Sequence, residues 1–461
     1  MPDKASRIMI IGWDCAPPDL VFNQFVDRMP NMSRLREQGC WGPLRSSHPP
    51  ITVPAWTCML TSRNPGQLGF YGFRNLKPGT YDGAWIATST AVREPRVWDL
   101  LPGHSVCIHG VPQTYPVKPV NGMVIADFLT PDLNSEYTYP PGLKTEIDQV
   151  ADGYLIDAEG FRTEDKAALL KQIYTVTNKH HLVNLHLLSR QRWDFFMAVE
   201  MGPDRLQHGF WKFCDPAHPK YEPGNPFESA LADYYAHLDA QLGELLALAD
   251  ENTLVMVVSD HGAKAMKGSL NINDYLIQEG LLCLREEVPP GTRFKPDLVD
   301  WSRTRAWAYG GYYSRVHMNV AGREPQGTIP AADYDRERDR LAAFLRAIPD
   351  DQGRPMATET LKPQEIFTGP YVNAAPDLLV YFDDLSWRAG QDVNNPSLYS
   401  FDTEIGPDDA VHDHHGILAM AGPGLSSHGE LSGLQLMDVA PTVLTHLGEA
   451  VPSVMEGKAI P

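Results

Sequence analysis

The stretch IMIIGWD at residues 8–14 is apolar up to its last residue, Asp14. A continuous apolar run of this length is typical of a parallel strand that is buried on both faces of a sheet. The pair Pro17-Pro18 follows it and signals a turn. Asp14 is therefore predicted to lie at the carboxyl end of a strand, where open α/β sheets bind their ligands.

Similar apolar runs recur at residues 195–199, 254–258, 378–381 and 417–421. Helical patterns separate them: Pro30 opens one helix that ends near Gly39, and apolar residues spaced three and four apart over 229–249 predict another. This alternation predicts an α/β fold with a mainly parallel central sheet and helices on both faces. Loop-rich stretches interrupt it, so we predict core parts at 1–112, 191–264 and 371–461, a cap insertion at 113–190 and a substrate-side insertion at 265–370.

Composition excludes several classes of partner. The net charge of −19 over 461 residues argues against a surface that binds nucleic acid polymers or membranes, and an anionic substrate would need local cations. The six cysteines show no CxxC spacing and sit mostly in apolar runs, which indicates free thiols. With no secretory signal pattern and no apolar stretch of membrane-spanning length, a cytoplasmic location is expected.

The segment Thr52-Val53-Pro54 precedes an apolar stretch that continues through Leu60. Pro54 suits the first turn of a helix, so Thr52 is predicted to lie just ahead of the helix N-terminus, where free backbone N–H groups favour an anion. The simplest role for Thr52 is an N-cap. As a nucleophile, its hydroxyl would need further activation, which a metal ion can provide.

Three hydrophilic clusters could supply metal ligands. Asp204 and His208 are four residues apart, so a helix opened by Pro203 would present both on one face. The other two clusters lie beside predicted strands: Asp260-His261-Gly262 ends the 254–258 run, and His412 belongs to a histidine-rich group before 417–421. Each cluster alone would be read as a turn, a cap or a solvated patch, but three of them at strand ends favour a metal site.

The ordered set of motifs resembles the type I phosphodiesterase and nucleotide pyrophosphatase branch of the alkaline phosphatase superfamily. The resemblance rests on Asp14, the Thr-Val-Pro segment at Thr52, and the acidic and histidine residues just described. It extends to Pro30-Asn31, residues 61–72, Asn271-Ile272-Asn273, residues 319–327, Val439-Ala440-Pro441-Thr442 and Gly457-Lys458. It covers most of the chain apart from 113–190 and implies an alkaline-phosphatase-like fold.

The resemblance also implies roles. One metal ion would be held by Asp204, His208 and His412, and a second by Asp14, Asp260 and His261 with Thr52 bound to it as nucleophile. Zinc is the expected ion at both sites, with manganese as an alternative, because mixed nitrogen and oxygen ligands suit these ions better than magnesium. The family spacing of four residues before Gly416 selects His412, and His414 is the competing ligand.

Substrate class is less determined by the sequence. Nucleotide-cleaving relatives carry an aromatic residue directly after the nucleophile and an Asn three residues after it, but this chain has Val53 and Ala55 there. Trp56 and Lys264 are predicted to contact the substrate, although a core position and a solvated loop are the ordinary alternatives. The absence of a cation near Thr52 in the sequence favours diesters over monoesters.

We therefore expect a metal-dependent phosphodiesterase that acts on a small-molecule phosphate ester through a covalent phosphothreonine. A phosphomonoesterase or phosphonate hydrolase on the same fold is the alternative, and a non-catalytic metal-binding protein is a third reading. A sulfatase is disfavoured because the Cys-x-Pro-x-Arg pattern is absent at Thr52.

Overall fold

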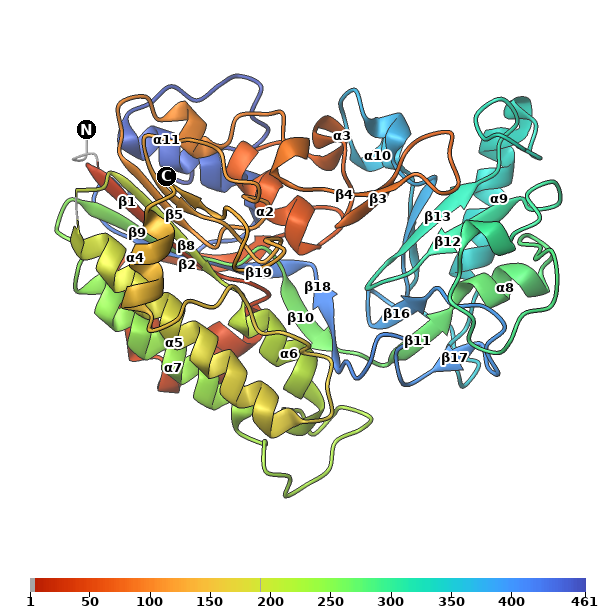
Figure 1. Cartoon of the computed structure of the whole chain (residues 1–461), viewed down its shortest axis with the longest axis horizontal. Helices are drawn as coiled ribbons and strands as arrows, with labels where there is room; N and C mark the ends of the chain where they lie inside the picture. The colour runs from red at the N-terminus through yellow and green to blue at the C-terminus, as the bar shows by residue number, and fades with distance from the viewer. Residues whose placement is uncertain (1–4, 191) are drawn as a thin grey trace.

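A ten-stranded, mainly parallel sheet forms the centre of the larger of two lobes in the computed structural model, which describes residues 5–190 and 192–461 (Figure 1). Its strands, in spatial order, are β20 (Gly429–Glu430), β2 (Cys40–Arg45), β19 (His415–Ala421), β9 (Thr253–Val258), β1 (Arg7–Trp13), β8 (Phe195–Glu200), β5 (Val106–His109), β6 (Gly122–Ile125) and β7 (Thr138–Tyr139), with β21 (Leu434–Gln435) beside β2. β1 pairs in parallel with β8 and β9, while β19 runs antiparallel to β2 and β9. The predicted α/β fold is confirmed.

The apolar run of β1 is continuous because both faces of the strand are covered. Met9 and Ile11 belong to one core cluster, whereas Ile8 and Ile10 belong to another on the opposite face. Successive side chains of a strand point to opposite faces, so two covered faces require apolar residues at every position.

Helices cover both faces of this sheet (Figure 1). The first face packs against α1 (Pro30–Gln38), α4 (Leu143–Val150), α5 (Lys166–Arg190), α6 (Gly202–Cys214) and α7 (Ala230–Leu246). The second face packs against α2 (Thr52–Thr61) and α11 (Val439–Leu447). Among the described residues, no helix is long and apolar enough to cross a membrane, and all six cysteines are free.

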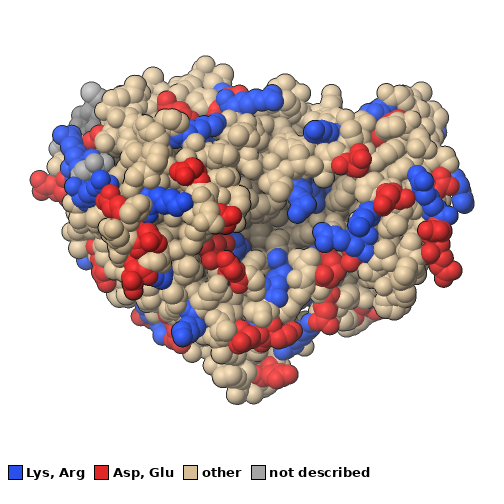
Figure 2. Space-filling view, in the orientation of Figure 1, with Lys and Arg blue, Asp and Glu red and all other residues tan. Residues whose placement is uncertain are grey.

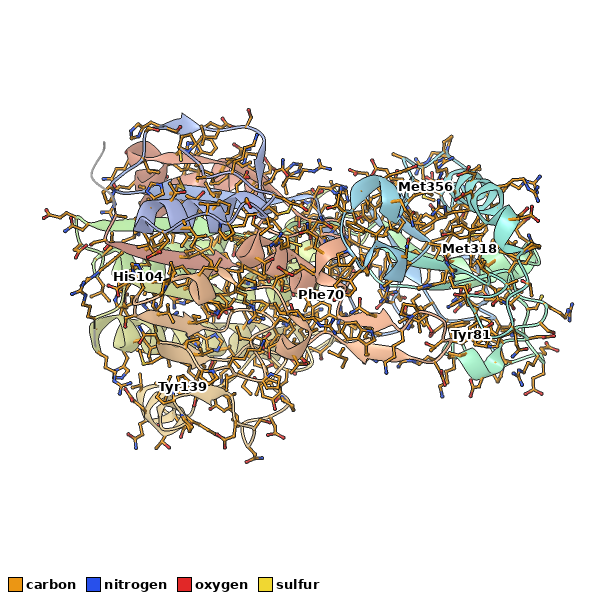
Figure 3. All side chains as sticks on the ribbon, turned by 90° about the horizontal axis from the view of Figure 1, so that it is seen from above. Phe70, Tyr81, His104, Tyr139, Met318 and Met356 are labelled. Atoms are coloured by element: carbon orange, nitrogen blue, oxygen red, sulfur yellow. The ribbon has the colours of Figure 1, made fainter. Side chains whose placement is uncertain are left out.

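The smaller lobe is built on two short sheets with their own core around Trp307, Leu378 and Val380. Figure 3 labels Met318 and Met356 of this core. One sheet has the order β12 (Ala306–Tyr309), β13 (Ser314–Met318), β15 (Leu378–Tyr381), β14 (Glu359–Leu361), and the other β16 (Trp387–Gly390), β11 (Gly268–Asn271), β17 (Tyr399–Ser400). Its helices are α8 (Ile272–Gln278) and α9 (Tyr334–Arg346). The hairpin of β3 (Arg74–Leu76) and β4 (Ala84–Ile86), with α3 (Pro65–Leu68) and α10 (Pro363–Ile366), lies between the lobes in Figure 1.

Two predicted boundaries are wrong. Residues 113–190 are not a cap, because β6 and β7 extend the central sheet and α5 packs on β8 and α6. The smaller lobe does not end at 370: the predicted strand at 378–381 forms, but as β15 it pairs with β13 and β14 in that lobe. The error at 113–190 arose because the strands there are short and their connections are long and polar. The error at 370 arose because an apolar run predicts a strand but not the sheet to which the strand belongs.

Candidate functional site

The carboxyl ends of three adjacent strands bring the predicted site residues together. Asp14 directly follows β1, Asp260 and His261 follow β9, and α6, which begins after β8, carries Asp204 and His208. His412 lies on β18 (Ala410–Asp413), which pairs with β10 (Gly262–Ala265) beyond the sheet. Each of these side chains is buried.

Thr52 is the first residue of α2, one position further into the helix than the sequence predicted. The helix axis thus points its positive end at the cluster. Thr52 Oγ1 lies 3.3 Å from His261 Nε2, and Pro50, just before it, accepts a hydrogen bond of 2.8 Å from His412 Nδ1. The same short segment therefore positions the hydroxyl and one of the imidazoles.

The first donor group consists of Asp204, His208 and His412. His208 Nε2 lies 3.3 Å from both His412 Nε2 and Asp204 Oδ1, and His412 Nε2 is 3.7 Å from that same oxygen. The thiol of Cys15 belongs to the same group, whose donor atoms all lie within 4.8 Å of one another. Two imidazoles, a carboxylate and a thiol converging in this way form a donor set suited to a transition ion.

The second donor group is built on Asp14 and His261, whose donor atoms converge within 4.8 Å together with an oxygen of Asp204, and Asp260 lies beside them. His261 Nε2 lies 3.2 Å from Asp260 Oδ2 and 3.9 Å from Asp14 Oδ1. Both of these buried carboxylate oxygens lack a hydrogen-bond partner among the described residues. Buried carboxylate oxygens are normally paired or coordinate metals, so this arrangement fits a second cation.

The pKa values of the buried donor residues also favour a bound cation. Burial raises the pKa of Asp14 well above its ordinary value, and the neighbouring Asp204 adds to the rise. Burial, followed by Asp14, has the same effect on the pKa of Asp260. Burial also lowers the pKa of His261 to about 4, and it lowers the pKa of His412 well below its ordinary value. The imidazoles of His261 and His412 are thus neutral and can each offer a lone pair to a cation, and a bound cation would favour the charged form of the buried Asp14 and Asp260 carboxyl groups.

Further contacts fix the orientation of the donors. Asp408 Oδ1 lies 2.8 Å from His208 Nδ1, and its other oxygen accepts hydrogen bonds from Tyr312 and Arg162 at 2.9 and 3.0 Å. The ring of Tyr312 also stacks on that of His208, with centroids 4.7 Å apart. Tyr312 comes from the smaller lobe, so both lobes hold this histidine.

Trp56 is buried. It does not line the cleft between the two lobes, although the predicted substrate contact would require it to. Its Nε1 donates a 2.7 Å hydrogen bond to Asp14 Oδ2. Gly12 makes room for the indole, because a Cβ there would lie 2.5 Å from Trp56 Cη2. The glycine that interrupts the apolar run of β1 therefore serves the orientation of Asp14.

Two further predicted residues, Lys264 and His414, lie outside the donor groups. Lys264 Nζ forms ion pairs of 3.0 Å with Asp384 and Asp413 and does not line the cleft, so its position does not match the predicted substrate contact. His414 Nε2 lies 3.1 Å from Asp384, outside both donor groups, whereas His412 points into the first.

The first donor group and Thr52 face a cleft of about 530 Å³ between the lobes, which is lined by Thr52, Asp204, His208 and His412. Figure 2 shows a hollow at the centre of the molecule with cationic side chains around it. Six arginines line the cleft: Arg74, Arg162, Arg205, Arg293, Arg315 and Arg388.

Sequence reasoning missed these arginines together with Cys15, Tyr312 and Asp408. Most of them lie far from Thr52 along the chain, and no local pattern marks them. Cys15 did carry a signal, because it directly follows Asp14. Its backbone adopts a left-handed conformation, with φ of 63°, which turns the chain sharply after the strand.

Comparisons with known proteins give a family and a fold. A family model described as type I phosphodiesterase / nucleotide pyrophosphatase matches residues 8–417. Curated protein sequences give no match. Among solved structures, human ectonucleotide pyrophosphatase / phosphodiesterase 5 is similar over 98% of this chain and 97% of its own, at 11% identity and a TM-score of 0.56. The murine protein of the same name is similar at 12% identity over 97% and 96% of the two chains, with a TM-score of 0.55, or 0.56 for an inactive form in complex with AMP. At these identities the likeness shows a shared fold.

Proposed function

Because the chain belongs to the type I phosphodiesterase and nucleotide pyrophosphatase family, whose members are hydrolases of phosphate esters, we propose that it is a two-metal phosphodiesterase with Thr52 as nucleophile. The observation that carries the proposal is the position of the Thr52 hydroxyl, 3.3 Å from His261 Nε2 and at the mouth of two buried donor groups. A structural N-cap needs no such surroundings.

Asp204, His208 and His412 would hold one divalent ion, and Asp14, Asp260 and His261 would hold the other together with Thr52. Zinc is the ion that we propose, with manganese as the alternative, because the donors mix nitrogen and oxygen. Such ions, when bound, lower the pKa of a coordinated hydroxyl and neutralise charge on the phosphoryl oxygens.

Thr52 would then act on the substrate directly. Its deprotonated Oγ1 forms a bond to phosphorus while the bond from phosphorus to the departing ester oxygen breaks, and that oxygen takes up a proton as the alcohol leaves. Water subsequently cleaves the phosphothreonine, which releases the monoester and restores the Thr52 hydroxyl. The N-terminus of α2 favours the phosphoryl charge throughout.

Diesters fit the surroundings of Thr52 better than monoesters. A monoester carries an additional negative charge that needs an available cation. Arg205, on the helix of the donor residues, is already bound to Asp204 at 2.6 Å and to Asp157, while Arg162 is bound to Asp408. The carboxylates therefore balance the arginines nearest to the donors.

The decisive experiment compares kcat/KM for bis(4-nitrophenyl) phosphate and 4-nitrophenyl phosphate with the zinc- and manganese-loaded protein. We expect the diester to be preferred at least about tenfold, which corresponds to about 1.4 kcal/mol of transition-state stabilisation. A preference for the monoester, or for a phosphonate tested in parallel, would contradict the proposal.

A further inference from the structure

The six arginines of the cleft fall into two sets. Three of them are balanced by acidic partners: Arg205 pairs with Asp157 and Asp204, Arg162 with Asp408, and Arg388 with Glu404 through two contacts of 2.6 Å. The other three, Arg74, Arg293 and Arg315, make no ion pair within 4.0 Å among residues 5–190 and 192–461. In a protein with a net charge of −19, three uncompensated cations facing one cleft are a local exception.

The uncompensated arginines, which we call the arginine pocket, come from three separate segments. Arg74 begins β3, Arg315 lies on β13, and Arg293 belongs to the loop before β12. Arg315 donates hydrogen bonds to the carbonyl oxygens of Arg74 and Gly310, so the backbone holds its guanidinium in place. Its Nε is buried without a partner.

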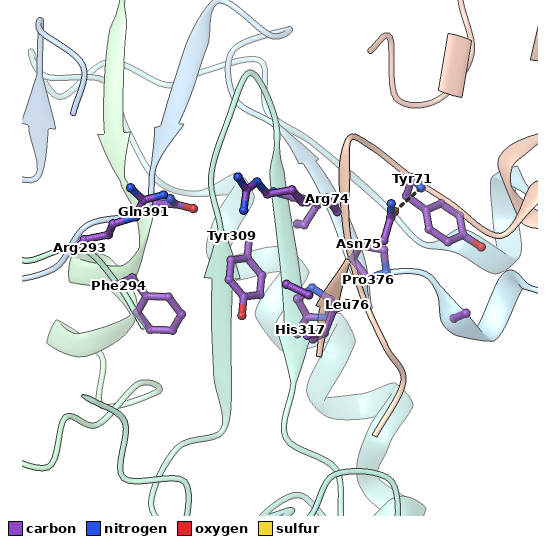
Figure 4. Close-up of a pocket in the computed structure, with 13 residues that line it drawn as sticks. Tyr71, Arg74, Asn75, Leu76, Arg293, Phe294, Tyr309, His317, Pro376 and Gln391 are labelled. Atoms are coloured by element: carbon purple, nitrogen blue, oxygen red, sulfur yellow. Dashed lines mark hydrogen bonds between the residues drawn. The ribbon is translucent and has the colours of Figure 1, made fainter. Parts of the chain in front are cut away.

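The same three arginines also line a second, adjoining cavity of about 150 Å³, together with Gln391 and aromatic side chains. Figure 4 shows Arg293 and Gln391 on one side of this cavity, Tyr309 in the middle, and Arg74 and His317 on the other. The rings of Phe294 and Tyr309 meet edge to face, with centroids 5.9 Å apart. They give the cavity an aromatic, apolar wall beside the three arginines.

Neighbouring titratable groups leave these positive charges in place. Burial lowers the pKa of His317 to about 4, so this imidazole is neutral at physiological pH. Asp392 is close enough to Arg293 for the positive charge to affect its carboxyl group, but no ion pair joins the two among the described residues. Burial raises the pKa of Asp392, and Arg293 only partly opposes that rise. The three guanidinium groups are therefore available for an anion from solution, and such groups bind phosphate or carboxylate with paired hydrogen bonds.

We infer that the arginine pocket binds a second anionic group, a phosphate or a carboxylate, carried on a flat or apolar ester moiety of the substrate. The inference rests on the proposed function, because the cleft that contains the pocket also contains Thr52. The phosphodiester would react at Thr52 while its distal anion is bound by Arg74, Arg293 and Arg315, and the connecting moiety packs against Phe294 and Tyr309.

Three substrates with one chromogenic leaving group test the inference: 4-nitrophenyl phenyl phosphate and its 4-carboxyphenyl and 4-phosphonooxyphenyl analogues. We expect the wild-type protein to favour the anionic diesters at least about tenfold in kcat/KM, and the preference to fall with rising salt. Which analogue is preferred distinguishes carboxylate from phosphate. A double substitution, Arg74→Gln with Arg293→Gln, should remove the preference mainly through KM and leave the neutral diester within about twofold.

Arg34→Gln is the matched control, because Arg34 is also exposed but lies on α1, in the larger lobe. It should leave all three substrates unchanged. Equal losses for neutral and anionic diesters in the double variant, or no loss for either, would overturn the inference.

A binding experiment separates this outcome from failure of the proposed function. Calorimetric titration of the Thr52→Ala protein with 4-carboxyphenyl phenyl phosphate and with diphenyl phosphate needs no turnover. We expect the carboxylated ligand to bind more tightly, and the arginine double substitution to raise its Kd about tenfold or more. Equal binding of both ligands would reject the pocket even if the enzyme hydrolyses diesters, whereas selective binding without hydrolysis by the wild-type protein would contradict the proposed function alone.

Discussion

His208 Nδ1 lies 2.8 Å from Oδ1 of Asp408, a residue 200 positions further along the chain. The contact leaves His208 Nε2 directed at Asp204 and His412. Burial opposes protonation of this ring, but Asp408 and Asp204 outweigh it and raise the pKa of His208 to about 9. A carboxylate behind a ligand histidine commonly fixes the ring and increases its basicity. Asp408 is thus the positioning partner of a proposed metal ligand.

Asp408→Asn should lower metal affinity and kcat by about 10- to 100-fold, because the amide cannot support the imidazole as a carboxylate does. Competition with a chromogenic chelator measures the affinity. Tyr312→Phe is the control: it removes the 2.9 Å hydrogen bond to Asp408 and the 3.1 Å contact of the hydroxyl with His208 Nδ1, but keeps the contact between Asp408 and His208. Its loss should be smaller, and equal effects of the two variants would argue against the assigned role.

Thr52→Ala should reduce turnover by at least about 10³-fold while leaving most of the bound metal in place, because the other ligands remain. Thr52→Ser keeps a hydroxyl and should retain measurable activity. Metal analysis and steady-state kinetics on the same preparations test this. Multiple turnovers by the alanine variant at a rate near that of the wild type would exclude Thr52 as the nucleophile.

Removal of metal should abolish activity and lower the melting temperature. Asp14 Oδ1 and Asp260 Oδ2 are buried without hydrogen-bond partners in the part of the chain that the structure describes, so their charges would lose compensation. A ligand that binds only the folded state at 100 times its Kd stabilises it by about 2.7 kcal/mol. Dialysis against chelator, followed by calorimetry and by readdition of zinc or manganese, measures both effects. Full activity after exhaustive chelation would contradict the mechanism.

Much of the fold could be predicted because the residues that determine it are local. The apolar run before Asp14 and the run over 254–258 are continuous since helices cover both faces of the sheet, and both became the expected strands β1 and β9. The strands β6 and β7 were missed because they contain four and two residues and carry little periodic signal. The error at 113–190 follows from that shortness.

The candidate site divides in the same way. All its proposed ligands except His412 follow a predicted strand or lie in the first turns of a helix, so sequence position alone brings them to one edge of the sheet. Tertiary contacts bring the other site residues into place, namely Asp408, Tyr312 and the arginine pocket. No pattern in the sequence next to these residues predicts their position. The absence of a cation near Thr52 in the sequence did not mean an uncharged cleft, because Arg293 and Arg315 reach it from the smaller lobe.

Trp56→Phe tests whether the indole positions Asp14. Phenylalanine preserves an aromatic ring but lacks the N–H that donates the 2.7 Å hydrogen bond to Asp14 Oδ2. We expect metal affinity to fall by about 10-fold or more, as for other groups that orient a ligand. Trp98→Phe is the control, because Trp98 belongs to the same core cluster and its indole N–H donates no hydrogen bond to a carboxylate in the part of the chain that the structure describes. If both variants bind metal equally, Trp56 acts only by packing.

Asp127 provides a prediction about stability that is independent of the metal site. It is buried, and its carboxylate accepts hydrogen bonds from the backbone N–H groups of Gln113 and Tyr115. Burial nevertheless raises the pKa of Asp127 from 3.8 to about 7, with those hydrogen bonds opposing the rise. Between these pH values the folded state binds more protons than the unfolded state, so the contribution of Asp127 to stability falls as pH rises from about 4 to about 7.

Asp127→Asn removes this titration, and its loss of one backbone hydrogen bond adds a cost that does not depend on pH. The free energy of unfolding of the variant, relative to wild type, should therefore increase between pH 5 and pH 8, by at most roughly 2.7 kcal/mol, because about two pH units separate pH 5 from the folded pKa. Urea denaturation at pH 5, 6, 7 and 8 measures the difference. Parallel curves for the two proteins would show that Asp127 is already ionised in the folded state at pH 5, and that its two backbone hydrogen bonds outweigh the cost of burial.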